Sequence, residues 1–262
     1  MTQVWHTVTE WLSRRRALDG RGIGFVPTMG ALHRGHASLV ARCRAENEVV
    51  VASIFVNPSQ FNDPKDLERY PRTLESDLAL LESLGADHVI VPTATELYPD
   101  GYCLRVEPVG GAPVMEAALR PGHMQGVMTV VLKLLGMVRP DRAYFGEKDY
   151  QQLRVVTDMA REFFVPTEIV PCPTVREATG LAESSRNRLL SPEGKEKAAW
   201  LFRALSTAAN SAEARSILEE QGFAVEYVEE RWARRLAAAR LEGVRLIDNV
   251  PFPGGADYAS HS

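Results

Sequence analysis

The fold of this chain is decided by the stretch FVPTMGALHRGH, residues 25–36. A short apolar run ends in Pro-Thr-Met-Gly, and two histidines three residues apart follow it. This order predicts a buried strand, a tight turn and the first turn of a helix. The unpaired amide groups and the dipole of a helix N-terminus favour negative charge, so a nucleotide's phosphates bind well at such a place. The stretch therefore indicates a phosphate-binding turn.

On both sides of this stretch, short apolar runs alternate with segments whose apolar residues recur at helical spacing. Residues 49–56, VVVASIFV, are typical of a central parallel strand that is covered on both faces. The pattern predicts strands at residues 23–26, 49–56, 88–91, 142–145 and 168–170, and helices at residues 6–18, 34–47, 72–84, 125–138 and 150–163. This alternation predicts an α/β fold with a doubly wound parallel (Rossmann-like) sheet and right-handed crossovers.

The alternation changes near residue 174, which divides the chain into two expected domains. Residues 1–173 form the Rossmann-like domain, and residues 174–262 form a smaller C-terminal α+β domain. In the second, a helix is expected from near Pro192 to about Ala209. The tail from about residue 252 is rich in Gly, Pro, Ser and Ala, so we expect it to be disordered.

Composition excludes several classes of protein. With 262 residues, 45% of them hydrophobic, the chain can bury a core without a metal or disulfide. The net charge of -4 argues against a general role on nucleic acids or membrane surfaces. The three cysteines are far apart in the sequence, and the N-terminus lacks an apolar signal segment, so we expect a cytoplasmic protein with reduced thiols.

Four polar motifs follow predicted strands or lie at the domain junction, at residues 27–36, 57–60, 146–152 and 184–187. Ligands of open α/β sheets bind beyond the carboxyl ends of the strands, so we expect these motifs to serve one site. His33 and His36 share a helix face and could ligate a metal or simply cap the helix. The preceding turn and Gly35, which allows close approach of a phosphate, favour a phosphate contact instead.

The sequence resembles a known family along nearly its whole length. Residues 27–36 resemble the HxGH signature of the nucleotidyltransferase superfamily, and the wider context resembles the pantothenate synthetase (pantoate–β-alanine ligase) family. Further blocks match this family in order: SIFVNPSQF (53–61), YPRT (70–73), RPGHMQGV (120–127), FGEKDYQQL (145–153), GLAESSRN (180–187) and RLIDN (245–249). Seven blocks in the same order make chance agreement very improbable.

The resemblance implies an ATP-dependent ligase. Pantoate would attack the α-phosphorus of ATP to form pantoyl adenylate and pyrophosphate, and β-alanine would then displace AMP to give pantothenate. It also implies Mg²⁺ on the phosphates, small-molecule substrates, no nucleic-acid or membrane partner, and a homodimer. The first domain would bind ATP and pantoate, and the second would act as a lid.

The resemblance also assigns residues. It implies a catalytic group of His33, His36, Lys148, Ser184, Ser185 and Arg186. It implies an ATP-binding group of Pro27, Met29, Gly30, His33, His36, Gly146, Lys148, Asp149, Val175, Ser184, Ser185 and Arg186. Pantoate would contact Met29, Gln60 and Gln152, and the β-alanine or pyrophosphate side would be lined by Asn57, Tyr70, Arg120 and His123. Asp77 is expected as a magnesium-side carboxylate, with an ordinary solvated helix residue as its alternative.

The match departs from the family pattern in few places. Glu183 stands where the family usually has an apolar residue, and we expect its side chain to point away from the phosphates because two like charges repel. The segment between Ala204 and Glu226 looks shortened, and Met124 and Ala117 replace the expected phenylalanine and glycine. Two other interpretations stay open: a cytidylyl- or adenylyltransferase with the same HxGH turn, and a nucleotide-binding module that has lost activity.

Overall fold

The computed structural model describes residues 1–109 and 113–252, which form two compact units. The first unit comprises residues 1–147 and 151–172. The second comprises residues 148–150 together with the chain from residue 173 onward. The expected first domain, residues 1–173, included residues 148–150, whereas in the structure this short segment groups with the second unit.

The first unit is built on a six-stranded, entirely parallel sheet in the order β1-β4-β3-β2-β5-β6. Its strands are β1 (Gln3–Trp5), β2 (Ile23–Thr28), β3 (Val49–Ile54), β4 (His88–Ile90), β5 (Arg142–Gly146) and β6 (Glu168–Cys172). Every residue of β3 is buried, as expected for a central strand. The α/β prediction with a doubly wound parallel sheet is confirmed.

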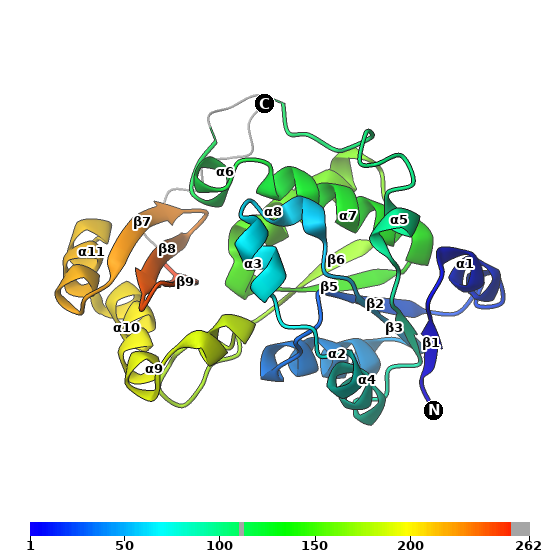
Figure 1. Cartoon of the computed structure of the whole chain (residues 1–262), viewed down its shortest axis with the longest axis horizontal. Coiled ribbons are helices and arrows are strands. Elements are labelled where there is room, and N and C mark those ends of the chain that lie inside the picture. Colours follow the sequence, from blue (N-terminus) through cyan, green and yellow to red (C-terminus); the bar gives the residue numbers. More distant parts are fainter. Residues whose placement is uncertain (110–112, 253–262) are drawn as a thin grey trace. The chain divides into compact units, whose positions relative to one another are not determined.

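Helices cover both faces of this sheet, with α2 and α4 on one side and α7 and α8 on the other (Figure 1). The helices of the unit are α1 (Val8–Arg16), α2 (Arg34–Glu46), η1 (Pro58–Gln60), α3 (Pro64–Arg69), α4 (Leu74–Ser83), α5 (Ala94–Leu97), α6 (Glu116–Leu119), α7 (His123–Val138) and α8 (Tyr150–Glu162), with the single turn η2 (Glu147–Asp149) before α8. The long helices match the predicted segments to within a few residues.

The N-terminal segment differs from the prediction. The helix expected over residues 6–18 forms as α1, but the edge strand β1, which precedes it, was not predicted. Helix α1 begins only after Thr7, whose hydroxyl accepts from Glu10 N while the Glu10 carboxylate accepts from Thr7 N. This capping box fixes the start of the helix and leaves the preceding residues to pair with β4.

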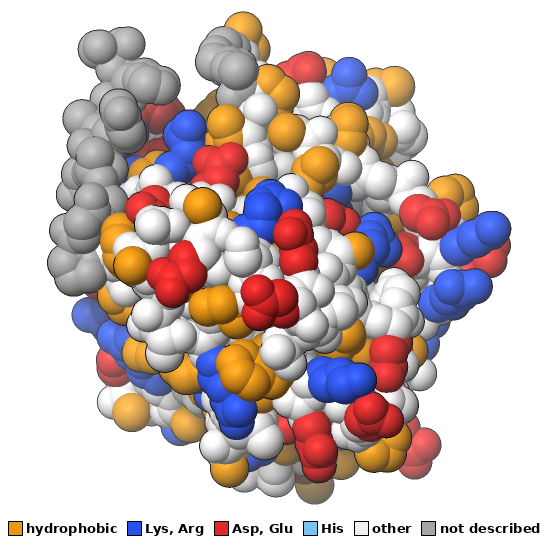
Figure 2. Space-filling view, turned by 90° about the vertical axis from the view of Figure 1, so that its left-hand side faces the viewer, with side chains coloured by type: hydrophobic (Ala, Val, Ile, Leu, Met, Phe, Trp, Pro, Cys, Tyr) orange, Lys and Arg blue, Asp and Glu red, His pale blue; other side chains and the backbone are white. Residues whose placement is uncertain are grey.

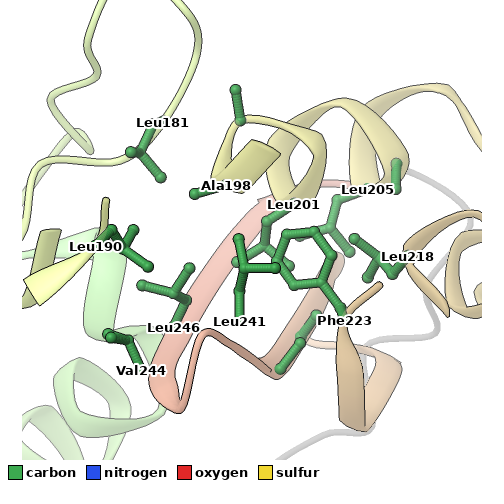
Figure 3. Close-up of a cluster of buried hydrophobic side chains, with 14 of the residues drawn as sticks. Leu181, Leu190, Ala198, Leu201, Leu205, Leu218, Phe223, Leu241, Val244 and Leu246 are labelled. Atoms are coloured by element: carbon green, nitrogen blue, oxygen red, sulfur yellow. The ribbon is translucent and has the colours of Figure 1, made fainter. Parts of the chain in front are cut away.

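The second unit contains a three-stranded antiparallel sheet, β7 (Ala224–Arg231), β8 (Arg234–Leu241) and β9 (Val244–Pro251). Its helical part comprises η3 (Ser185–Leu189), α9 (Pro192–Ala198), α10 (Trp200–Thr207) and α11 (Ser211–Glu220). Leucines of α10 and α11 meet Phe223 and Leu246 in one buried cluster (Figure 3). The single helix expected from Pro192 to about Ala209 is interrupted at Ala199.

The surface carries charges of both signs. On the face shown in Figure 2, basic and acidic side chains lie interspersed with single apolar ones, in keeping with a small net charge. None of the helices within residues 1–109 and 113–252 has the length and hydrophobicity of a membrane-spanning segment. The tail expected to be disordered lies outside the described residues, apart from Phe252.

Candidate active site

The turn after β2 adopts a backbone conformation that few residues tolerate. Gly30 has a φ of +78° and Ala31 a φ of +50°. A Cβ atom on Gly30 would lie 3.0 Å from a carboxylate oxygen of Asp77 and 3.1 Å from Cγ2 of Ile54. The turn therefore needs glycine at position 30 both for its conformation and for space, while the alanine at 31 is held in a costly conformation by its surroundings.

Asp77 on α4 supplies much of that hold. Its side chain is 3% exposed, and its carboxylate accepts from Ala31 N at 2.9 Å and from Leu32 N at 2.8 Å. The Thr73 hydroxyl donates a third bond at 3.0 Å. With both oxygens engaged by protein donors, Asp77 positions the turn, and its expected role beside magnesium stays a prediction that this geometry does not favour.

His33 and His36 cap the helix that follows. The Nδ1 atom of His33 accepts from Gly35 N at 3.2 Å, and the Nδ1 atom of His36 accepts from His33 N at 3.4 Å. The two rings lie with centroids 4.2 Å apart. This is a capping box in which imidazoles replace the usual hydroxyl and carboxylate.

The capping bonds determine the chemistry of both rings. When Nδ1 of a neutral imidazole accepts a hydrogen bond, the proton lies on Nε2. Each histidine of the pair is therefore a donor at Nε2, beside the N-terminus of the 13-residue helix α2. Donors at such a position are suited to a phosphate oxygen.

A buried amide network follows the carboxyl end of β3. Asn57, 1% exposed, donates to the Gln60 side chain at 3.1 Å and to Gly126 O at 3.2 Å, and it accepts from the Tyr98 hydroxyl at 2.8 Å. The Gln60 amide nitrogen lies 2.8 Å from the sulfur of Met29. The structure thus brings together Met29 and Gln60, two of the residues expected to contact pantoate.

Helix α7 supports this network from its first turn. Nδ1 of His123 donates to the backbone oxygen of Gln60 at 2.8 Å, so its Nε2 is the acceptor that receives a bond from Arg120 at 3.0 Å. A Cβ atom on Gly126 would lie 2.4 Å from Ser59 O, so a glycine is needed for helix and turn to approach this closely. Nη2 of Arg120 donates to the same backbone oxygen at 3.4 Å, so Arg120 and His123 both contact the backbone of Gln60.

The remaining site residues of this unit are less closely linked. Tyr70 stacks edge-on against Phe61, with centroids 5.6 Å apart. Gln152 is half-buried on α8, and the described residues include no hydrogen bond between it and Gln60. Pro27 is half-buried within β2, and a Cβ atom on Gly146, at the end of β5, would meet open space. The predicted pairing of the two glutamines on one substrate thus stays a prediction.

In the second unit, the segment of residues 148–150 contacts β8, β9 and Trp232 in the turn between β7 and β8. The backbone oxygen of Lys148 accepts from the Asn249 side chain at 3.0 Å. The Tyr150 ring lies under the guanidinium of Arg234, 4.3 Å from its centroid. Nζ of Lys148 lies 3.8 Å from the Asp149 carboxylate. The position of the Lys148 backbone is therefore set by the second unit.

The loop of Ser184–Arg186 lies in the same unit. Oγ of Ser184 accepts from Arg186 N at 3.2 Å and so caps the short helix η3. Glu183 N donates to Val175 O at 2.9 Å. The side chains of Ser185 and Arg186 are half-buried and make no hydrogen bond or ion pair within residues 1–109 and 113–252. These donors are thus available to a ligand.

An ion pair that sequence reasoning missed lies in the same unit and joins Arg176 to β9. Arg176 binds both oxygens of Asp248, at 2.6 and 2.9 Å, and its guanidinium lies 4.1 Å from the centroid of Phe202. It also donates to Gly180 O at 3.1 Å. The Asp248 side chain is almost completely buried. The only signal in the sequence was the position of Asp248 in the matching block of residues 245–249.

A metal ion bound by protein side chains requires a group of ligands placed around one point. The part of the chain that the structure describes contains no group of three or more His, Cys, Asp or Glu side chains placed to hold a metal ion.

Tyr98 is a second residue that sequence reasoning missed, because its link to Asn57 spans 41 positions in the chain. Burial raises the pKa of its hydroxyl to about 12, so Tyr98 is a neutral donor at physiological pH.

Comparison with known proteins supplies the family. The family model described as "Pantoate-beta-alanine ligase" matches residues 1–251. A pantothenate synthetase of Bdellovibrio bacteriovorus is 50% identical over 250 residues, which cover 95% of this chain and 99% of that protein. One of Legionella pneumophila is 46% identical and covers 94% and 98%. Both relatives are thus matched over almost their full length.

Two solved structures have the same fold as this chain over nearly its whole length. The pantoate-beta-alanine ligase of Francisella tularensis, complexed with beta-gamma ATP and beta-alanine, superposes with a TM-score of 0.91 at 40% identity, covering 96% of this chain and 98% of that one. The pantothenate synthetase of Thermus thermophilus gives a TM-score of 0.86 at 46% identity, covering 96% and 100%.

Proposed function

The chain belongs to the pantoate-beta-alanine ligase family, and on that premise we propose how its residues carry out the reaction. The protein is a ligase that joins pantoate to β-alanine, with ATP as a substrate. In the proposed first step, a pantoate carboxylate oxygen bonds to the α-phosphorus of ATP. The bond between that phosphorus and the oxygen that bridges it to the β-phosphorus breaks, and pyrophosphate leaves. In the second, the amine of β-alanine bonds to the acyl carbon, loses a proton, and AMP leaves.

We assign the phosphates to the turn after β2. Nε2 of His33 and Nε2 of His36 would donate to phosphate oxygens and stabilise the charge that grows on the leaving pyrophosphate. Pro27, Met29 and Gly30 would contact the nucleotide. Because the Asp77 bonds fix this turn before ATP arrives, little reorganisation is needed during the reaction.

Pantoate is assigned to the amide network. Gln60 and Gln152 would bind its hydroxyl and carboxylate groups, because an amide offers both a donor and an acceptor. The contact between the Gln60 amide and the Met29 sulfur supports an apolar partner for the gem-dimethyl group beside a polar one for the hydroxyl. Asn57, Tyr70, Arg120 and His123 would line the β-alanine or pyrophosphate side.

The second unit would supply cations and hydroxyls to ATP. Lys148 is a mobile point charge for the phosphates, and Ser184, Ser185 and Arg186 would add two hydroxyl donors and a fixed cation. Gly146, Asp149 and Val175 complete the proposed nucleotide contacts. The half-buried side chains of Ser185 and Arg186, which have no protein partner in the described residues, support this assignment.

Magnesium, the homodimer and the cytoplasmic location are also proposals. Since the described residues hold no three-ligand cluster, we place Mg²⁺ on the triphosphate oxygens, where it would keep much of its water shell and neutralise charge. The expected dimer is tested by the mass of the purified protein in solution. We further propose that residues from about 174 onward act as the lid.

The histidine capping box at the start of α2 is the observation that carries this assignment. The test is pyrophosphate release that requires both D-pantoate and ATP, followed by AMP and pantothenate on addition of β-alanine. Failure to release pyrophosphate with pantoate would favour another nucleotidyltransferase activity. If His33→Ala and wild type proved equally inactive while both bound ATP, the chain would be a nucleotide-binding module.

A further inference from the structure

A polar cavity lies at the amino ends of strands in the parallel sheet. It has a volume of about 190 Å³ and is lined by Gln3, Arg14, Arg21, Val49, Asp87 and His88, together with Met1. Val49 and His88 are the first residues of β3 and β4, so the cavity lies at the amino ends of the strands. The turn after β2 and the amide network after β3 lie at the carboxyl ends of their strands. The cavity is therefore separate from the site described above. Its lining includes Gln3 of β1 and Arg14 of α1, two elements that can be followed in Figure 1.

Arg14 on α1 contributes a cation that the protein does not neutralise. Its Nε atom is buried and has no hydrogen-bond partner, and its guanidinium forms no ion pair within the described residues. The neighbouring Arg15 shows the contrast, because it donates to Val138 O and Arg139 O and pairs with Asp19 at 2.6 Å. A buried donor without a partner costs free energy unless a ligand or water satisfies it.

His88 presents a second donor. Its side chain is 3% exposed, and Nδ1 accepts from the Trp5 indole at 3.3 Å, so the proton of the neutral ring lies on Nε2. The Trp5 and Trp11 rings lie 6.0 and 5.7 Å from the imidazole centroid and restrict its orientation. Burial, and then the charge of Arg14, lower the pKa of His88. The ring is therefore a neutral donor close to an uncompensated cation.

The other charges at these strand ends are already paired. Asp87 receives a bond from Arg44 at 2.7 Å and another from Val50 N at 2.7 Å. Arg21 pairs with Glu48 at 2.7 Å. Among these five side chains, three guanidinium groups accompany two carboxylates, which leaves the positive charge of Arg14 in excess. The carboxylate of Asp87 in the lining is neutralised by Arg44, so it does not repel an anion at full strength.

We propose that this cavity binds a small tetrahedral oxyanion, free phosphate or the phosphate group of a small monoester, between the guanidinium of Arg14 and Nε2 of His88. Arg14 is the principal contact, since a guanidinium binds an oxyanion with two parallel hydrogen bonds. A cavity of this size also has space for bridging water.

The experiment compares wild type with Arg14→Gln, with Arg16→Gln as the matched control. Arg16 lies on the same helix but is exposed, so its loss removes the same charge without touching the cavity. The nucleotide site is first saturated with a non-hydrolysable ATP analogue. Binding of inorganic phosphate, glycerol 2-phosphate and acetate is then measured by calorimetry at constant ionic strength. Binding of the monoester identifies a phosphorylated metabolite as the source, and its exclusion identifies free phosphate.

We expect wild type and Arg16→Gln to bind phosphate equally and Arg14→Gln to bind it at least tenfold more weakly. Phosphate should also shift the Nε2 resonance of His88 and raise its pKa, because the anion offsets the charge of Arg14. Without phosphate, Arg14→Gln should unfold at the same temperature as wild type or higher. Equal phosphate binding by Arg14→Gln, no binding by wild type, or a lower melting temperature of unliganded Arg14→Gln would each overturn the proposal.

Should Arg14→Gln not fold, Arg14→Lys keeps the charge but loses the forked geometry. We expect it to fold and to bind phosphate more weakly than wild type, with the same His88 resonance shifted. Unchanged affinity in Arg14→Lys together with an unshifted His88 resonance would equally overturn the proposal.

Discussion

The two loops assigned to the phosphates of ATP are built in opposite ways. In the turn of residues 28–32, the amide groups of Ala31 and Leu32 are bound by a buried carboxylate, and backbone strain is already present without a ligand. In the loop of residues 184–186, one hydroxyl caps a short helix, and the side chains of Ser185 and Arg186 have no protein partner in the described residues. The first loop is shaped by the protein, whereas the second keeps its donors for the ligand. Damage to the first should therefore reduce both stability and activity, and damage to the second mainly activity.

The largest effect is expected from Asp77→Ala. Two buried amide groups lose their acceptor, at about 1–3 kcal/mol each, and the turn loses its shape. We expect kcat/KM to fall at least about a hundredfold, equal to about 2.7 kcal/mol, with a clear loss of stability in urea. Glu75→Ala, an exposed position on the same helix, is the control. Wild-type kinetics in Asp77→Ala would show that the carboxylate does not position the turn.

A smaller loss is expected from Gly30→Ala. The new methyl group would meet Asp77 and Ile54 in a left-handed conformation that costs about 1–2 kcal/mol. We expect a lower melting temperature and about a tenfold fall in kcat/KM. Ala31→Gly is the counterpart, because it relieves strain at φ +50° and should not destabilise the protein. If Gly30→Ala and Ala31→Gly had the same melting temperature and the same kcat/KM, backbone strain in this turn would not explain the need for glycine at position 30.

Ser184→Ala probes the second loop. The lost cap should cost about 1 kcal/mol of stability, while the KM for ATP should rise by more than that loss predicts if the hydroxyl also contacts phosphate. Ser191→Ala is a matched control, since Ser191 caps α9 and bonds Glu242 at 2.7 Å. It should lose stability with an unchanged KM. If Ser184→Ala, like Ser191→Ala, lost stability while its KM for ATP stayed unchanged, Ser184 would act only as a helix cap.

The smallest effect is expected from Glu183→Met. If the side chain points away from the phosphates, the KM for ATP should stay nearly unchanged, as steady-state kinetics can test. A tenfold drop in KM, about 1.4 kcal/mol, would instead mean that the carboxylate repels the triphosphate.

Local patterns predicted the framework of the first unit well. The apolar run of β3 and the order of strand, turn and helix around β2 are short-range signals, and their segments formed as expected. The histidine pair was also visible, but its capping role was only one of several options. Contacts between distant residues were not predictable: the Asp77 bonds span 45 and 46 positions, and the Arg176–Asp248 pair spans 72. The break at Ala199 was missed because no proline or glycine marks it.

The grouping of residues 148–150 with the second unit has a consequence for protein engineering. The chain passes between the units at residues 147/148, 150/151 and 172/173, so the second unit is not a module that one cut can remove. A chimaera that exchanges only residues 173–252 with a relative would pair a foreign residue 249 with the native backbone of Lys148. Recombination between relatives should therefore transfer residues 148–150 together with the C-terminal part, so that the lysine keeps the neighbours that position it.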